Sequence, residues 1–127
     1  VSWLMNLLVG DQGGSNPLLE LVLSSHDPLA LSFLILTTVV LAPLFEELIF
    51  RGVLLPVLVK ETGLIWGVLT SALVFGVAHL SVGELPPLFV LGIGLACLRL
   101  SSGRLIPCVL MHSLWNGVTF ANLILLG

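Results

Sequence analysis

The sequence has 127 residues, enough for one compact domain, but 57% of them are hydrophobic, only 9% are charged, and the mean hydropathy is +1.20. Soluble domains are less apolar than this, so lipid surroundings are expected. A net charge of −3 with 4 Lys and Arg residues excludes the clustered basic surface that binds nucleic acid. We therefore expect an integral, multi-pass membrane protein that contacts a lipid bilayer and binds no nucleic acid.

Residues 1–28 are predicted to form a tail before the membrane domain. They lack the basic segment and small-residue cleavage site of a signal peptide, so none is expected. After a polar turn, Asn16 and Pro17 are typical of a helix N-cap and a first helical position. We expect a short interfacial helix over about residues 17–25 and a single membrane domain over residues 29–127.

The first apolar segment runs from Leu29 to Val59, which is longer than the roughly 20 residues that a membrane span needs. We expect this segment to be tilted, or kinked near Pro43. Polar turns, of which the second covers residues 81–87, separate it from three further apolar segments at 64–80, 88–100 and 105–126. The predicted fold is all-α, a polytopic transmembrane helical bundle of about four membrane segments.

The charges of the turns predict an orientation. If all the segments span the membrane, the turns at 60–63 and 99–104 share one side, which holds Lys60, Arg99 and Arg104. The opposite side holds acidic residues, among them Glu84. Because basic loops are retained inside, the basic side is predicted to be cytoplasmic or its equivalent.

Small residues in the third segment suggest close packing. Gly92, Gly94 and Ala96 are expected to allow close contact between helices, as small residues do in bilayers. Cys97 and Cys108 lie in apolar stretches without a CxxC pattern. We expect both to be small buried hydrophobic residues rather than a disulfide or a metal pair.

Three ionisable residues interrupt the first segment, and charges at membrane depth are costly unless they have a function. On a helix, Glu47 and Arg51 are spaced i, i+4 and share a face, whereas Glu46 points about 100° away from Glu47. Glu47 and Arg51 are therefore predicted to form an ion pair that cancels their charges. Glu46 is left as the candidate general base.

Two later segments each carry a pair of residues at the same i, i+4 spacing, Phe75 with His79 and His112 with Asn116. The polar members of these pairs are His79, His112 and Asn116. At about 1.5 Å of rise per residue, these polar groups and Glu46 lie on the order of 10–25 Å from the basic side and could meet at one depth. Glu46 and His79 could then activate water. The His112 imidazole and the Asn116 amide could stabilise an oxyanion.

Two alternatives stay open at this point. Intramembrane His and Asn side chains can also join helices through hydrogen bonds, as expected for a non-catalytic membrane immunity or assembly factor. Two histidines and a glutamate, here His79, His112 and Glu46, could instead hold zinc with water as the fourth ligand, although no HExxH pattern is present. Ser113 lacks the partners of a serine hydrolase triad.

The motifs Glu46-Glu47-x-x-x-Arg51, Phe75-x-x-x-His79 and His112-x-x-x-Asn116, in this order on apolar segments, resemble those of the CAAX protease and bacteriocin-processing family (CPBP, or Abi) of intramembrane endopeptidases, in particular the type II CAAX prenyl endopeptidases. The resemblance covers about residues 40–120. It implies an all-helical membrane fold and peptide hydrolysis by water that Glu46 and His79 activate. His112 and Asn116 would be the oxyanion-stabilising pair, while the remaining motif residues would support the site.

The same resemblance favours a glutamate mechanism without a metal or other cofactor, with zinc as the alternative. Eukaryotic members of the family cut prenylated CAAX tails, whereas bacterial relatives work in bacteriocin maturation, self-immunity and regulation. It therefore implies a peptide or protein substrate, which can itself be membrane-associated, without defining its sequence. A bacterial plasma membrane and an organelle membrane fit equally well.

Overall fold

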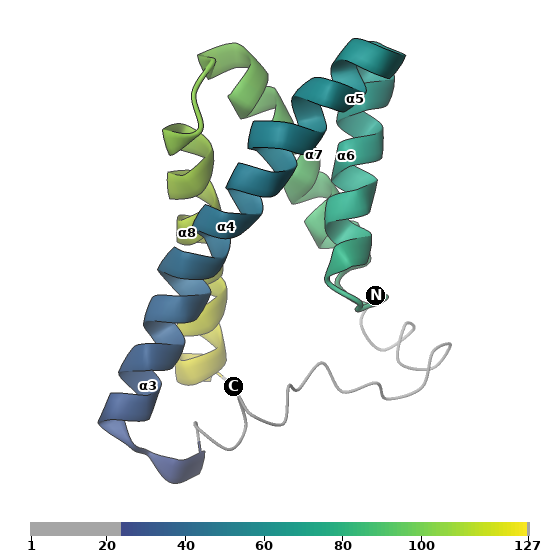
Figure 1. Cartoon of the computed structure of the whole chain (residues 1–127). Helices are drawn as coiled ribbons and strands as arrows, with labels where there is room; N and C mark the ends of the chain where they lie inside the picture. The colour runs from purple at the N-terminus through teal and green to yellow at the C-terminus, as the bar shows by residue number, and fades with distance from the viewer. Residues whose placement is uncertain (1–23, 127) are drawn as a thin grey trace.

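The computed structural model describes residues 24–126, which are almost entirely helical and contain no strand (Figure 1). The interfacial helix predicted over about residues 17–25 lies outside the described residues except at its last two positions. The first membrane helix starts as predicted, because Asp27 caps it by accepting a hydrogen bond from the Leu29 N–H at 3.0 Å. Pro28 follows as the first helical residue, where a missing N–H has no cost.

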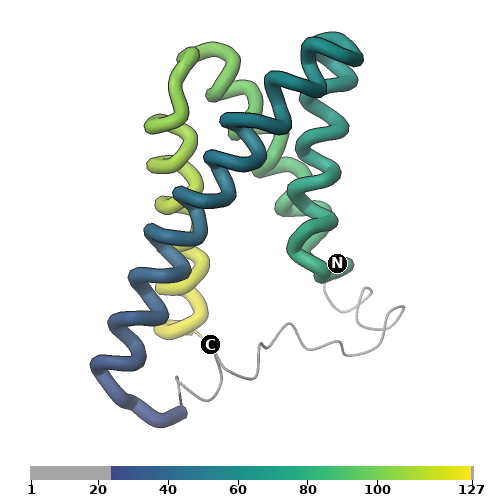
Figure 2. The backbone as a smooth tube through the Cα atoms, viewed as in Figure 1, coloured from purple at the N-terminus to yellow at the C-terminus, as the bar shows by residue number. Residues whose placement is uncertain are grey.

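The first membrane helix is one continuous run of 35 residues, Pro28–Thr62. Figure 2 shows its backbone as an unbroken coil that crosses the molecule diagonally. It is divided into α3 (Pro28–Ile35), the π turn η1 (Leu36–Leu41), α4 (Ala42–Ile49), the π turn η2 (Phe50–Leu54) and α5 (Leu55–Thr62).

Three further helices complete the described bundle: α6 (Leu64–Ala78), α7 (Leu85–Ser102) and α8 (Ile106–Leu126). The first helix, α7 and α8 are long and apolar enough to cross a membrane, and α6 is a shorter apolar helix of 15 residues. The predicted all-α membrane bundle is therefore confirmed. The predicted turn over residues 81–87 was too long, because α7 already begins at Leu85. Pro86 and Pro87 occupy its first turn, where the helix needs no N–H donor.

Each π turn in the first helix ends two residues before a proline. At the end of η1, the Ala42 N–H donates to the Thr37 carbonyl, which is the i to i+5 bond of a π turn. The next residue, Pro43, has no N–H. The Thr38 carbonyl is thus left without a donor from its own helix. Near Pro43, where a kink was one of the two expectations, the structure has a π turn within a continuous helix, and η2 repeats this π turn before Pro56, which was not predicted.

Side chains from other helices bind the two carbonyls that these prolines leave free. The Asn116 amide of α8 donates to the Thr38 carbonyl at 3.0 Å. In the second turn the Leu55 N–H bonds to Phe50, and the Arg51 carbonyl instead accepts the Nε–H of Arg99 from α7 at 3.3 Å. The prolines therefore create the acceptors through which α7 and α8 bind the first helix.

Small residues bring α6 close to its neighbours α5 and α7, with which it packs most extensively. A Cβ on Gly67 would lie 2.6 Å from the Val59 Cα, and one on Gly92 would lie 3.0 Å from the Ala72 Cα. The close contact predicted at Gly92 is confirmed. Gly94 differs, because the nearest atom to its position is a side-chain methyl at 3.8 Å.

The two cysteines show that an apolar sequence does not predict burial in this bundle. Cys108 is fully buried, as predicted, beside Leu95 and Phe75 in the core. Cys97 is exposed, so that prediction was wrong. The reason is physical: outward-facing residues of a membrane helix contact lipid and are as apolar as those in the core.

The two basic turns lie at the same end of the bundle, at the top of Figure 1. Each contains a glycine with positive φ, Gly63 at +95° and Gly103 at +69°. Lys60 and Arg99 line one cavity there. The predicted placement of these turns on one side is therefore confirmed, whereas their cytoplasmic orientation stays a prediction.

Candidate active site

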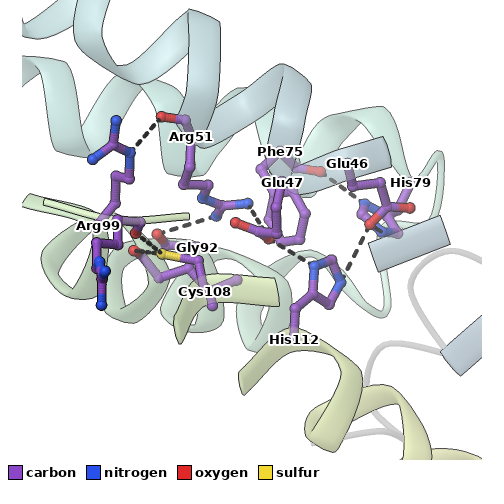
Figure 3. Close-up of polar contacts among 11 residues, drawn as sticks. Glu46, Glu47, Arg51, Phe75, His79, Gly92, Arg99, Cys108 and His112 are labelled. Atoms are coloured by element: carbon purple, nitrogen blue, oxygen red, sulfur yellow. Dashed lines mark hydrogen bonds and ion pairs between the residues drawn. The ribbon is translucent and has the colours of Figure 1, made fainter. Parts of the chain in front are cut away.

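Three helices bring the predicted polar residues together in the interior of the bundle, as Figure 3 shows. Glu46 and Glu47 come from α4, His112 comes from α8, and His79 is the C-cap of α6. The α6 helix stops there because Leu80, the next residue, adopts a positive φ of 56°. The His79 ring is thereby held at the end of a rigid helix rather than in a loop.

Glu47 and Arg51 form the predicted ion pair. The distance between Arg51 Nη1 and Glu47 Oε1 is 3.0 Å, and the two side chains are 1% and 0% exposed, respectively. Arg51 Nη2 also donates to the Gly92 carbonyl at 3.2 Å, and the guanidinium lies over the Phe75 ring at 4.2 Å from its centroid. A buried charge is tolerable when it is paired in this way, so the local prediction is confirmed.

His112 connects the two glutamates, a contact that the sequence did not predict. Its Nδ1 lies 2.7 Å from Glu47 Oε1, and because a carboxylate only accepts, Nδ1 carries the proton of this hydrogen bond. Its Nε2 lies 3.2 Å from Glu46 Oε2. A hydrogen bond between these two atoms would need a proton on Nε2, because a carboxylate only accepts.

His79 faces Glu46 with its ring nitrogen Nε2. Its Nδ1 lies 2.8 Å from the Phe75 carbonyl, which only accepts, so Nδ1 is the protonated nitrogen in the neutral ring. The Nε2 lone pair then faces Glu46 Oε2 at 3.8 Å. That distance is too long for a direct hydrogen bond but short enough for one bridging water.

Glu46 differs from Glu47 in the exposure of its side chain. Its side chain is 30% exposed, whereas that of Glu47 is fully buried. Glu46 Oε2 is itself buried and has no hydrogen-bond partner among the described residues. A buried carboxylate oxygen normally binds a donor, and the ring nitrogens that face this one are His112 Nε2 at 3.2 Å and His79 Nε2 at 3.8 Å. Glu47 Oε2 and Arg51 Nε also lack a hydrogen-bond partner, but their side chains are fully buried.

Phe75 holds the site together from the side. Its buried ring meets His79 and His112 edge-on, with centroid distances of 4.9 and 5.5 Å, and Phe50 at 5.3 Å. Such edge-to-face contacts restrict the orientation of both imidazoles. The predicted supporting role of Phe75 fits this position, although the Phe75 side chain has no group that could take part in the reaction.

The structure does not bring Asn116 to the carboxylates. Its amide lies on the same helix as His112 but donates to the Thr38 carbonyl. Of the four groups that were expected to converge, Glu46, His79 and His112 therefore do so, and Asn116 does not. Helical periodicity could not reveal the Thr38 contact, because the acceptor is a backbone atom freed by a proline.

The zinc alternative would rest on His79, His112 and Glu46. Within residues 24–126, no group of three or more His, Cys, Asp or Glu residues is placed so that it could hold a metal ion. Both ring nitrogens of His112 face carboxylates, and Nδ1 is engaged in a hydrogen bond to Glu47. A metal would need one of these nitrogens unprotonated and free.

Comparison with known proteins establishes the family. Residues 28–118 match the family model described as type II CAAX prenyl endopeptidase Rce1-like. The chain belongs to this family. The matched range contains every predicted site residue, and together with the apolar helices it makes the chain an integral membrane protein of a family of membrane endopeptidases.

Two curated relatives support the same family. Over 81 residues, 64% of this chain, it is 43% identical to the CAAX prenyl protease 2 of Rattus norvegicus, of which 26% is covered. Over 101 residues, again 64% of this chain, it is 40% identical to the CAAX prenyl protease 2 of Homo sapiens, of which 31% is covered. The chain thus spans about a quarter to a third of the length of these relatives. No solved structure matches the chain.

Proposed function

We propose that this chain is a membrane endopeptidase that hydrolyses a peptide bond with water activated by Glu46 and His79. The observation that carries the proposal is the buried Glu46 Oε2, which makes no hydrogen bond among the described residues and faces His79 Nε2 at 3.8 Å. A water molecule between these two acceptors would donate one hydrogen to each. Its oxygen lone pair would then be free to attack a carbonyl carbon.

In the first step the water oxygen forms a bond to the peptide carbonyl carbon while Glu46 takes a proton from the water. The electron pair of the C=O bond moves to the carbonyl oxygen and makes it an oxyanion. His112 Nε2, which lies beside Glu46, would stabilise this oxyanion when it carries a proton, because its N–H is then a positioned donor. Asn116 would add a second donor only after turning away from Thr38.

In the second step the oxyanion re-forms the C=O bond and the C–N bond breaks. The leaving amine takes the proton held by Glu46, so the products are a carboxylic acid and an amine and the site returns to its starting state. Glu47 and Arg51 would take no part in bond making. Their buried ion pair would hold His112 in place through the Nδ1 hydrogen bond.

The names of the relatives indicate which substrate class to test. The relatives are named CAAX prenyl proteases, so we propose a membrane-associated peptide of the CAAX type as the first substrate to test. The 127-residue chain would be placed in liposomes with a prenylated CAAX peptide, and products would be measured by mass spectrometry. Glu46→Gln and His79→Ala are expected to slow hydrolysis by roughly 10²–10⁴-fold. Glu61→Gln, an exposed acid on α5, is the matched control and should retain the parent rate.

Hydrolysis that continues unchanged in both Glu46→Gln and His79→Ala would contradict the mechanism. Absence of turnover by the parent, with no change in fold on either substitution, would favour a non-catalytic role of the polar cluster. Zinc is tested separately by incubation with a chelator. We expect activity to persist, whereas activity that disappears with chelator and returns with added zinc would replace the proposed water activation by a metal mechanism.

A further inference from the structure

The end of the bundle that holds the basic turns contains a cavity of its own. Its volume is about 370 Å³, and it lies between the last turns of α5 and α7. None of the residues of the candidate active site lines it. The lining residues are Pro56, Val59, Lys60, Arg99, Leu100 and Gly103.

The two cations of this cavity have no acidic partner. Within residues 24–126, every ion pair involves Glu46 or Glu47, and none involves Lys60 or Arg99. Arg99 is half-buried, and its Nε–H is bound to the Arg51 carbonyl, which orients the guanidinium on one side. A positioned guanidinium and an exposed ammonium at one cavity, without an internal counterion, attract an anion from outside the protein.

The position of the cavity indicates which anion. Helices α5 and α7 end at Thr62 and Ser102, so their last turns lie where membrane helices meet the headgroup layer. Besides the two cations, the lining includes the apolar side chains of Val59 and Leu100 and a proline. A phospholipid has the same arrangement, with a phosphate next to its glycerol and acyl chains. Anionic leaflets attract basic residues close to their surface, which agrees with the predicted orientation.

We propose that this cavity binds the phosphate of an anionic phospholipid from the surrounding leaflet. Arg99 would contact two phosphate oxygens through its terminal nitrogens, and Lys60 would close the other side. Lipid bound there would also join α5 to α7 at the turn where Arg99 already holds the first helix. This site is independent of hydrolysis, so its test does not depend on the proposed activity.

The test is native mass spectrometry of the 127-residue chain released from detergent with equal amounts of phosphatidylglycerol and phosphatidylcholine of identical chains. Phosphatidylglycerol is expected to bind preferentially. Lys60→Gln and Arg99→Gln should each weaken its binding roughly fivefold, the effect of one cation near an anionic lipid. Arg104→Gln is the matched control, because Arg104 is exposed at the same end and does not line the cavity. It should change binding less than about twofold.

Lys60→Gln keeps the experiment decisive even if Arg99→Gln fails to fold, because the exposed Lys60 side chain makes no hydrogen bond or ion pair among the described residues. Equal binding of the two lipids would overturn the proposal. So would an Arg104→Gln effect as large as that of Lys60→Gln, which would mean diffuse attraction to the whole basic end. Displacement of bound phosphatidylglycerol by millimolar inorganic phosphate would also overturn it, since the site would then take a free anion.

Discussion

The hydrogen bond between Asn116 and the Thr38 carbonyl should depend on Pro43. In the parent protein Pro43 offers no N–H, so the Asn116 amide is the donor for that carbonyl at 3.0 Å. Replacing Asn116 by leucine leaves the carbonyl without a donor. An unsatisfied buried acceptor costs about 1–3 kcal/mol in proteins, and hydrogen bonds between membrane helices reach about 1.7 kcal/mol. We therefore expect Asn116→Leu to lower the free energy of unfolding by about 1–2 kcal/mol.

In a Pro43→Ala background the same substitution should cost much less. The backbone N–H that alanine restores at this position can donate to the Thr38 carbonyl and complete the π turn, so Asn116 is no longer its necessary partner. Pro43 is fully buried, and Pro43→Ala will change stability by itself. A double-mutant cycle removes that effect and isolates the coupling, which we expect to be about 1 kcal/mol.

The assay is reversible unfolding in mixed detergent micelles, followed by circular dichroism, for the parent, the two single variants and the double variant. A matched control uses the second π turn. Pro56→Ala should leave the cost of Asn116→Leu unchanged, because Pro56 frees a different carbonyl that Arg99 binds. If Asn116→Leu costs the same with proline or alanine at position 43, the prolines do not create these acceptors and the reasoning is refuted.

Three further substitutions test the packing and charges around the site by the same unfolding assay. Glu47→Gln should destabilise the protein by about 3–5 kcal/mol, because Arg51 is left as an unpaired buried charge, and adding Arg51→Met should recover part of the loss; equal stability of Glu47→Gln and the parent would contradict the ion pair. Gly92→Ala should destabilise by roughly 1–3 kcal/mol, since its Cβ would lie 3.0 Å from a backbone atom of α6, whereas Gly94→Ala on the same helix should be tolerated. Phe75→Leu should cost about 1–3 kcal/mol by removing edge contacts and the cation–π contact with Arg51, and a neutral result would show that the ring positions nothing.

Local features of this protein could be predicted because they depend on residues within one helix. Apolar stretches of sufficient length predicted the membrane helices, and these are confirmed. The i, i+4 spacing of Glu47 and Arg51 predicted their ion pair, which has a length of 3.0 Å. The start of α7 was missed because prolines in the first turn of a helix look the same in sequence as prolines in a turn.

The contacts that assemble the candidate site could not be predicted in this way, because they join residues on different helices. His112 and Glu47 are separated by 65 positions, and the Asn116 and Thr38 pair by 78. Helical periodicity states which side chains share a face of one helix, but not the rotation or depth at which two helices pack. The exposed Cys97 has a related cause, since lipid rewards apolar residues on the outside as the core does on the inside.

The sequence by itself determined that the chain is a helical membrane protein and made Glu46, His79 and His112 its candidate catalytic groups, because charges in lipid are costly enough to stand out. Only the tertiary structure decided which partner each of these groups contacts. It placed His112 between two glutamates, brought Glu46 Oε2 to face the Nε2 atoms of both histidines, and directed Asn116 to a backbone carbonyl instead. The physical reason is that packing, through two prolines and close glycine contacts, sets which polar atoms still lack a partner.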